Sequence, residues 1–300
     1  MISAAWKLLV DTTLSFIDDE ALSRGAAIAF YAITSLAPVL LIVIAVAGMV
    51  FGRDAAQDAI SGQFSTLMGK QAADVLQSVI ASASTKSSSI VATIVGIAML
   101  LATASGVFGE MQAALNTIWK TRSREVALSR LIRARITSLG LVAALGYLLV
   151  VSLVVSAGLT AFASYLDRLP VGTLILSALN FAVSWLLFAS LFGAIYKVLP
   201  DRTLQWKDVI IGALMTSLLF NIGKALIGWY IGSSAVASSY GAAGGLIVLL
   251  LWVYYSAQIF LFGAEFTKIY ANTHGSKKAR CGLADRFRPF RKGQISLTGG

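Results

Sequence analysis

The sequence predicts an all-α, polytopic integral membrane protein with six transmembrane helices and short amphipathic helices at the membrane surface. The first observation is compositional: 57% of the 300 residues are hydrophobic and only 13% are charged, whereas soluble domains carry about 25% charged residues. The second is that long uncharged apolar stretches alternate with short polar segments. The third is that most Lys and Arg residues fall in every second polar segment, which indicates a fixed orientation in a membrane.

Six stretches are long enough to cross a bilayer. A hydrocarbon core of about 30 Å requires about 20 mostly apolar residues, because a helix rises about 1.5 Å per residue. The predicted spans lie near residues 26–51, 90–110, 136–163, 171–198, 208–231 and 242–267. We therefore expect a six-helix transmembrane domain over residues 1–271, followed by a basic tail at 272–300.

The basic residues predict the orientation of these spans. Of the 24 Lys and Arg residues, 19 lie in the termini and in the connections after the second and fourth spans. Four lie in the other connections, and Lys224 lies within a span. Because short cytoplasmic segments are enriched in Lys and Arg, both termini are predicted to be cytoplasmic. Membrane orientation therefore explains the net charge of +10 without a nucleic-acid partner. The basic tail is in addition suited to contact anionic lipid.

Two other regions have the apolar periodicity of surface helices. Residues 3–20 place one apolar stripe along a helix, formed by Trp6, Leu9, Val10, Thr13, Leu14 and Ile17. We interpret this segment as a cytoplasmic interfacial helix, with packing on the bundle's own loops as the alternative. Residues 52–89 contain two apolar sets at helical spacing, which predict two short amphipathic helices that rest on the membrane or cap the bundle.

Lys224 is the basic residue that membrane orientation leaves unexplained. It lies sixteen residues beyond Asp208, which places it about 24 Å from the cytoplasmic end of the fifth span. Asn221 precedes it by one turn on the same face. One interpretation is a cation in a cavity that attracts an anionic substrate or lipid headgroup. The other is a side chain that extends to the outer interface.

Two carboxylates lie at the predicted cytoplasmic ends of spans. Glu110 ends the second span and Glu265 lies near the end of the sixth. The simplest expectation is a structural ion pair with a nearby basic residue, namely Arg24, Lys120 or Lys268. Proton coupling is the alternative, since ionisable groups at membrane depth are often functional.

Pro38 interrupts the first predicted span. It removes one backbone hydrogen bond and is expected to kink or break that helix. Transporters often form their binding sites from such broken helices. The residues that we expect to line a substrate path are Lys224, Asn221, Pro38, Glu110, Glu265, Tyr254 and Gln258.

Two glycine pairs at a spacing of four have the pattern of close helix contacts in membranes. They are Gly228 with Gly232, and Gly241 with Gly245. They flank a short uncharged connection, which predicts a tight hairpin between the fifth and sixth spans, with a flexible external gate as the alternative. The same glycine faces make a homo-oligomer possible.

The sequence contains no pattern typical of an enzyme. It has no Walker motif, so the chain by itself does not power transport with ATP. Cys281 is the sole cysteine and His274 the sole histidine, which is too few nitrogen and sulfur ligands for a zinc site. The carboxylates are dispersed rather than clustered as in a two-metal nuclease. We therefore expect no catalytic residues, metal or cofactor.

Several stretches occur in an order that is typical of one protein family. They read AAIAFY at 26–31, SLAP at 35–38, ALNTIW at 114–119, KVLP at 197–200 with Trp206, YGAAGGLI at 240–247, LWVYYSA at 251–257 and GAEF at 263–266. Over about residues 20–270 the chain resembles the YihY/BrkB family of bacterial inner-membrane proteins. That resemblance implies a six-helix fold in the cytoplasmic membrane. Members have been called virulence or serum-resistance factors, and some were once labelled ribonuclease BN.

Two functional hypotheses follow from these observations. The first is transport without ATP, or envelope maintenance, involving an anionic lipid or another amphiphile handled between helices. The alternative is a scaffold that does not transport, which assembles through its glycine faces and recruits partners with its basic tail. A ribonuclease activity has no support, because the sequence lacks a clustered acidic or metal site.

Overall fold

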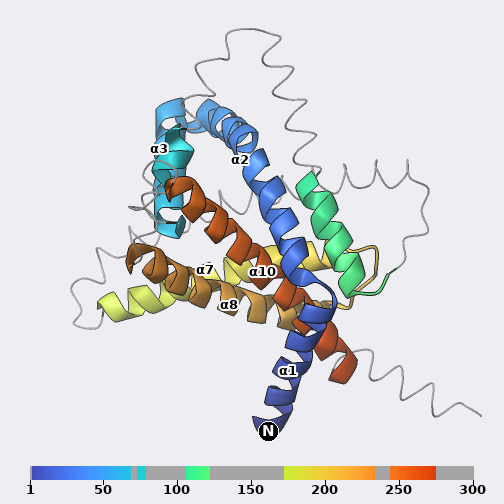
Figure 1. Cartoon of the computed structure of the whole chain (residues 1–300). Coiled ribbons are helices and arrows are strands. Elements are labelled where there is room, and N and C mark those ends of the chain that lie inside the picture. Colours follow the sequence, from blue (N-terminus) through green and yellow to red (C-terminus); the bar gives the residue numbers. More distant parts are fainter. Residues whose placement is uncertain (1, 69–72, 79–105, 122–171, 234–243, 275–300) are drawn as a thin grey trace, which may run out of the picture.

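The computed structural model describes residues 2–68, 73–78, 106–121, 172–233 and 244–274 (Figure 1). All regular secondary structure in these ranges is helical, and they contain no strand. The labelled helices are α1 (Ile2–Asp18), α2 (Ala21–Phe51), α3 (Arg53–Met68), α7 (Gly172–Val198), α8 (Trp206–Ser233) and α10 (Gly244–Thr273). Residues 73–78 and 106–118 are helical as well. The predicted all-α class is confirmed.

Three described helices are long and apolar enough to cross a membrane. The qualifying segments are Phe181–Val198 of α7, Trp206–Gly228 of α8 and Gly244–Thr273 of α10, and a shorter apolar helix covers Ala21–Leu36. These segments lie within or overlap the spans predicted at 171–198, 208–231, 242–267 and 26–51. The span predicted at 136–163 lies outside the described residues, as do residues 90–105 of the span predicted near 90–110. The count of six spans therefore stays a prediction.

Helix α2 continues through Pro38 as a single helix of 31 residues. Figure 1 shows that α2 bends along its length. Two hydroxyls in the preceding turn bond back to the helix: Thr34 Oγ1 donates to Tyr31 O at 2.9 Å and Ser35 Oγ donates to Ala32 O at 2.9 Å. Such bonds, together with the missing proline N–H, bend a helix without breaking it.

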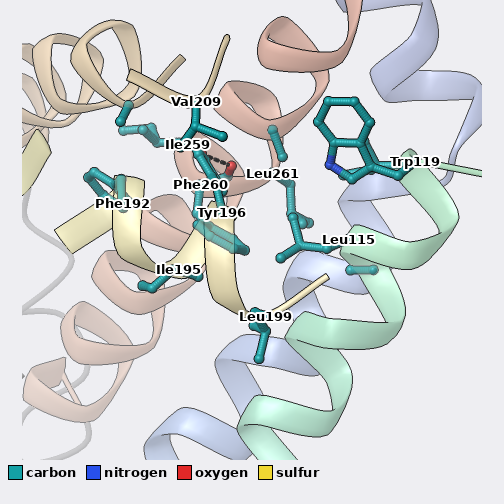
Figure 2. Packing of buried hydrophobic residues seen from close by; sticks show 14 of the residues in the cluster. Leu115, Trp119, Phe192, Ile195, Tyr196, Leu199, Val209, Ile259, Phe260 and Leu261 are labelled. Atoms are coloured by element: carbon teal, nitrogen blue, oxygen red, sulfur yellow. Dashed lines mark hydrogen bonds between the residues drawn. The ribbon is translucent and has the colours of Figure 1, made fainter. Parts of the chain in front are cut away.

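Helix α8 packs against α7 on one side and α10 on the other, and α10 also contacts α2 and α1. The core between α7, α8 and α10 is aromatic, with the ring centroids of Tyr196 and Phe260 5.3 Å apart. Figure 2 shows the Tyr196 hydroxyl directed at the α10 backbone, where it donates to Phe260 O at 2.6 Å. The same hydroxyl lies 3.1 Å from Thr216 Oγ1 of α8. One buried side chain therefore joins three helices.

Glycines allow α8 and α10 to approach closely. A Cβ on Gly212 would lie 1.8 Å from Thr267 Oγ1, and a Cβ on Gly263 would lie 1.9 Å from Thr216 Oγ1. Farther along, a Cβ on Gly223 would lie 2.3 Å from the Tyr255 hydroxyl. The residue numbers of the contacting positions increase along α8 as they decrease along α10. The two helices are therefore antiparallel, as a hairpin requires.

Of the glycines singled out in the sequence, Gly228 is the one whose neighbours the structure describes. Gly228 is exposed, and an added Cβ would meet nothing within 4 Å in the described structure. Gly245 is buried at the start of α10, and Gly232 lies in the last turn of α8. Gly241 and most of the connecting turn, residues 234–243, lie outside the described residues. The close α8–α10 contact thus uses Gly212, Gly223 and Gly263.

Candidate functional site

Asp19 lies at the corner between α1 and α2. Helix α1 ends at Asp18, and Glu20 then takes a left-handed conformation with φ 54°. This turn directs the chain back along the bundle and leaves Asp19 only 5% exposed. The sequence pattern did not single out Asp19, because its partners are far away in the chain.

A buried cluster of charges joins α1, α10 and the end of the 106–121 segment. We call it the charge cluster and define it as Asp19, Glu265, Lys268 and Lys120. Lys268 Nζ lies 2.7 Å from Glu265 Oε2 and 3.0 Å from Asp19 Oδ2. Lys120 Nζ forms an ion pair with Asp19 Oδ1. Two acidic and two basic side chains thus meet in one cluster, and Glu265 is paired with Lys268, one of the basic partners expected from the sequence.

The two carboxylates of the charge cluster are not equivalent. Glu265 is 0% exposed, and its Oε1 accepts no hydrogen bond from the described residues. Burial raises the pKa of Asp19, but its contacts with Glu265, Lys120 and Lys268 lower it more. The net effect places the pKa of Asp19 below its ordinary value of 3.8. Asp19 is therefore ionised in the folded protein, and it is the carboxylate that contacts both lysines.

A second polar contact connects the 106–121 segment to the connection after α7. The Asn116 amide nitrogen donates to Asp201 Oδ2 at 2.8 Å, and the Asp201 N–H returns a bond of 2.9 Å to Asn116 Oδ1. Gln112 donates to Asp201 Oδ1 at 3.0 Å, and Arg202 donates to the carbonyl of Trp119 at 3.1 Å. These bonds hold Lys120 near Asp19, since Lys120 directly follows the bonded turn.

Lys224 lies apart from the charge cluster. It is half-buried on α8 and forms no hydrogen bond or ion pair with a described residue. Asn221 is buried one turn earlier, and its amide donates to Ser217 O at 2.9 Å. Because Gly223 faces Tyr255, Lys224 is level with the middle of α10. Glu265 is about ten residues farther along α10, which corresponds to about 15 Å.

The other predicted lining residues are distributed over several surfaces. Gln258 points from α10 to α2, where its amide donates to Leu22 O at 3.2 Å. It lies over Gly25, whose absent side chain leaves room for it. Tyr254 and Glu110 are half-buried, and Pro38 lies within α2. The structure therefore brings Glu265 into the charge cluster, joins Gln258 to α2 and gives Lys224 no polar partner among the described residues.

The described residues contain no group of three or more His, Cys, Asp or Glu side chains able to hold a metal ion. The charge cluster has only two carboxylates, and each is already engaged by a lysine. Its chemistry is that of an ionic contact between helices. Lys224, in contrast, is a cation whose charge no described residue balances.

Comparison with known proteins identifies relatives of the chain. A membrane protein of the UPF0761 group from Pseudoalteromonas translucida is 27% identical over 84% of this chain and 81% of its own length. Another from Alteromonas mediterranea is 32% identical over 62% of this chain and 61% of its own length. A third, from Pasteurella multocida, is 31% identical over 59% of this chain and 54% of its own length. The matches to the last two span less than two thirds of those relatives.

No solved structure matches the chain. The family model described as "Virulence factor BrkB" matches residues 13–285. That range includes α2, α7, α8 and α10, the charge cluster and Lys224. The chain therefore belongs to the BrkB family of membrane proteins, as the resemblance in the sequence implied.

Proposed function

We propose that this chain moves an anionic amphiphile, such as an anionic lipid, between the two sides of the bacterial inner membrane without using ATP. Lys224 is the residue that meets the anionic headgroup. The observation that carries the proposal is a half-buried lysine, with no carboxylate partner among the described residues, in a helix long enough to cross a membrane.

The energetic cost of that lysine supports the proposal. A cation at membrane depth is unfavourable unless it finds a counter-charge or water. The charge cluster meets this requirement with carboxylates, but those lie about 15 Å farther along the bundle. An anionic ligand at Lys224 supplies the counter-charge that the described residues do not, and the buried amide of Asn221 is one turn away.

Extension of the side chain to the outer interface is the competing explanation. Lys224 lies four residues before Gly228, where the apolar segment of α8 ends. Lysine side chains near helix ends often reach the interface in this way. Under this explanation the lysine anchors α8, and its removal leaves any transport unchanged.

A flux assay on the full chain separates these possibilities. Purified protein is placed in liposomes containing phosphatidylglycerol labelled with a fluorophore, and transfer is followed by chemical reduction of the exposed label. We expect transfer by the unmodified protein and a loss of about tenfold in Lys224→Ala, which corresponds to about 1.4 kcal/mol. Lys224→Arg should retain transfer because it keeps the charge.

Lys207→Ala is the matched control, since Lys207 is an exposed lysine at the other end of α8. Unchanged transfer in Lys224→Ala would remove the named site. Absence of transfer by the unmodified protein would overturn the activity and favour the scaffold alternative.

A further inference from the structure

Helix α1 turns a mixed face, which includes Thr12, Ser15 and Phe16, toward the protein and an apolar face outward. Thr12 is 0% exposed and Asp19, just beyond the helix, is 5% exposed. On the other side Trp6 is 68% exposed, Leu14 56% and Ile17 59%. A helix on the surface of a soluble protein has the opposite arrangement. The outward face of α1 is therefore suited to an apolar medium.

Specific contacts hold α1 in this orientation. Lys268 of α10 donates to Ser15 Oγ at 3.2 Å and to Asp19 Oδ2 at 3.0 Å. The ring centroids of Phe16 and Phe262 lie 5.7 Å apart in an edge-to-face contact. Rotation of α1 to bury its apolar face would separate these partners. The exposed apolar face is thus a consequence of how α1 is attached.

The charged side chains of α1 occupy a third face. Lys7, Asp11 and Asp18 recur at spacings of four and seven residues, which places them along one edge of the helix. This edge borders both the inward face and the outward apolar face. Three separate faces, directed to protein, to water and to an apolar phase, are the arrangement of a helix that lies at a membrane interface.

Lipid is the occupant that the surroundings of the apolar face favour. Helix α2 also exposes large apolar residues: Leu22 just before the predicted span and Phe30 within it. Trp6 carries the side chain most enriched at membrane interfaces, and Lys7 next to it is suited to anionic headgroups. In Figure 1, α1 lies at the end of the bundle where α10 also ends.

We propose that α1 lies at the boundary between headgroups and acyl chains, with its apolar face in the lipid and the charge cluster as the contact that attaches it to α10. The lipid leaflet that α1 contacts would be the one at the end of the bundle that the sequence predicts to be cytoplasmic. The proposal does not depend on lipid transport, because a scaffold with the same fold would hold α1 in the same position.

Site-directed spin labelling tests the position of α1. In a Cys281→Ser background of the full chain, Ile17→Cys and Asp18→Cys are labelled with a nitroxide and studied in liposomes. Both positions are exposed, but they lie about 100° apart around the helix. We expect the label at 17 to collide mainly with oxygen, which partitions into lipid. The label at 18 should collide mainly with a water-soluble nickel chelate.

Two results would overturn the lipid contact. If both labels collide mainly with the nickel chelate, α1 projects into water. If the label at 17 is shielded from both reagents, another protein surface or a second copy of the chain covers the face. Leu14→Cys provides a second position on the same face if Ile17→Cys does not fold.

The role of the charge cluster is tested in the same spectra. Asp19→Asn added to the Ile17→Cys protein should increase the mobility of the label, because Lys268 and Lys120 lose their shared carboxylate. Lys120→Met is a milder variant at an exposed side chain and should produce a smaller increase. Unchanged mobility in both variants would show that the cluster does not attach α1.

Discussion

At the residue scale, the side chains of the charge cluster exchange contacts with water for ion pairs with one another. Transferring two carboxylates and a lysine away from water is costly, and their mutual attraction offsets that cost only while all partners remain. Lys268 is the shared member, since it contacts Glu265, Asp19 and Ser15. Loss of one member therefore leaves a neighbour with an uncompensated buried charge.

Asp19→Asn is expected to destabilise the protein by about 2 kcal/mol. Breaking a buried pair typically costs about 3–5 kcal/mol, but the exposed Lys120 is screened by water and contributes less. The measurement is the free energy of unfolding in detergent micelles. Asp18→Asn is the matched control, because Asp18 is an exposed neighbour and should change stability by less than about 0.5 kcal/mol. Equal effects of the two variants would contradict a role for the cluster.

The lowered pKa of Asp19 predicts a dependence of stability on pH. Since its pKa is lower in the folded protein than its ordinary value of 3.8, the folded state prefers the ionised form. The contribution of Asp19 is therefore present above about pH 3.8 and is lost as the pH falls through the lowered pKa. We expect the melting temperatures of the unmodified protein and of Asp19→Asn to differ at neutral pH and to converge on acidification. A difference that persists undiminished to about pH 2 would contradict this assignment.

At the element scale, the contact between α8 and α10 depends on glycines opposite threonines. Gly212 faces Thr267 and Gly263 faces Thr216, and each threonine hydroxyl bonds back to its own helix. These bonds satisfy the hydroxyls inside an apolar bundle, where an unpaired polar group is costly. Helix packing here is consequently tight and intolerant of added volume.

Gly263→Ala is expected to destabilise the bundle by about 1–3 kcal/mol, the usual cost of overpacking. The new methyl group would meet both Thr216 Oγ1 and the Tyr196 hydroxyl within 3 Å, so the bond from Tyr196 to Phe260 would be displaced. Gly228→Ala is the matched control and should be neutral or slightly stabilising, because alanine favours helix and its methyl group meets nothing within 4 Å. The measurement is thermal unfolding of both variants in the same detergent. Equal losses of stability in Gly263→Ala and Gly228→Ala would contradict the prediction.

At the scale of the whole molecule, the antiparallel α8–α10 pair separates two kinds of charge. The charge cluster lies at the end of the bundle where α1, the 106–121 segment and α10 meet, and both of its lysines have an acidic partner. Lys224 lies toward the other end, and no described residue balances it. The first arrangement joins helices, whereas the second is the site at which we propose that an anionic headgroup binds.

The single natural cysteine allows a test of the predicted topology. We expect Cys281 in intact spheroplasts to react with a membrane-impermeant maleimide only after permeabilisation, because both termini are predicted to be cytoplasmic. In a Cys281→Ser background, Ser238→Cys in the predicted external turn should react without permeabilisation. Labelling of Cys281 in intact spheroplasts would contradict the assigned orientation.

The sequence by itself determined the all-α membrane class, the positions of α2, α7, α8 and α10 and the family. These properties depend on hydropathy, charge and residue order, which are local along the chain. It also indicated which face of α1 is apolar, since helical periodicity is local as well. It did not indicate what covers that face.

Only the tertiary structure decided which residues meet. Asp19 lies 249 residues from Lys268 and 101 from Lys120, and no local pattern connects them. The same holds for the glycines: spacing drew attention to Gly228, whereas the fold places Gly212, Gly223 and Gly263 against α10. The physical reason is that spacing within a helix defines a face, while the identity of the neighbour depends on how distant helices pack.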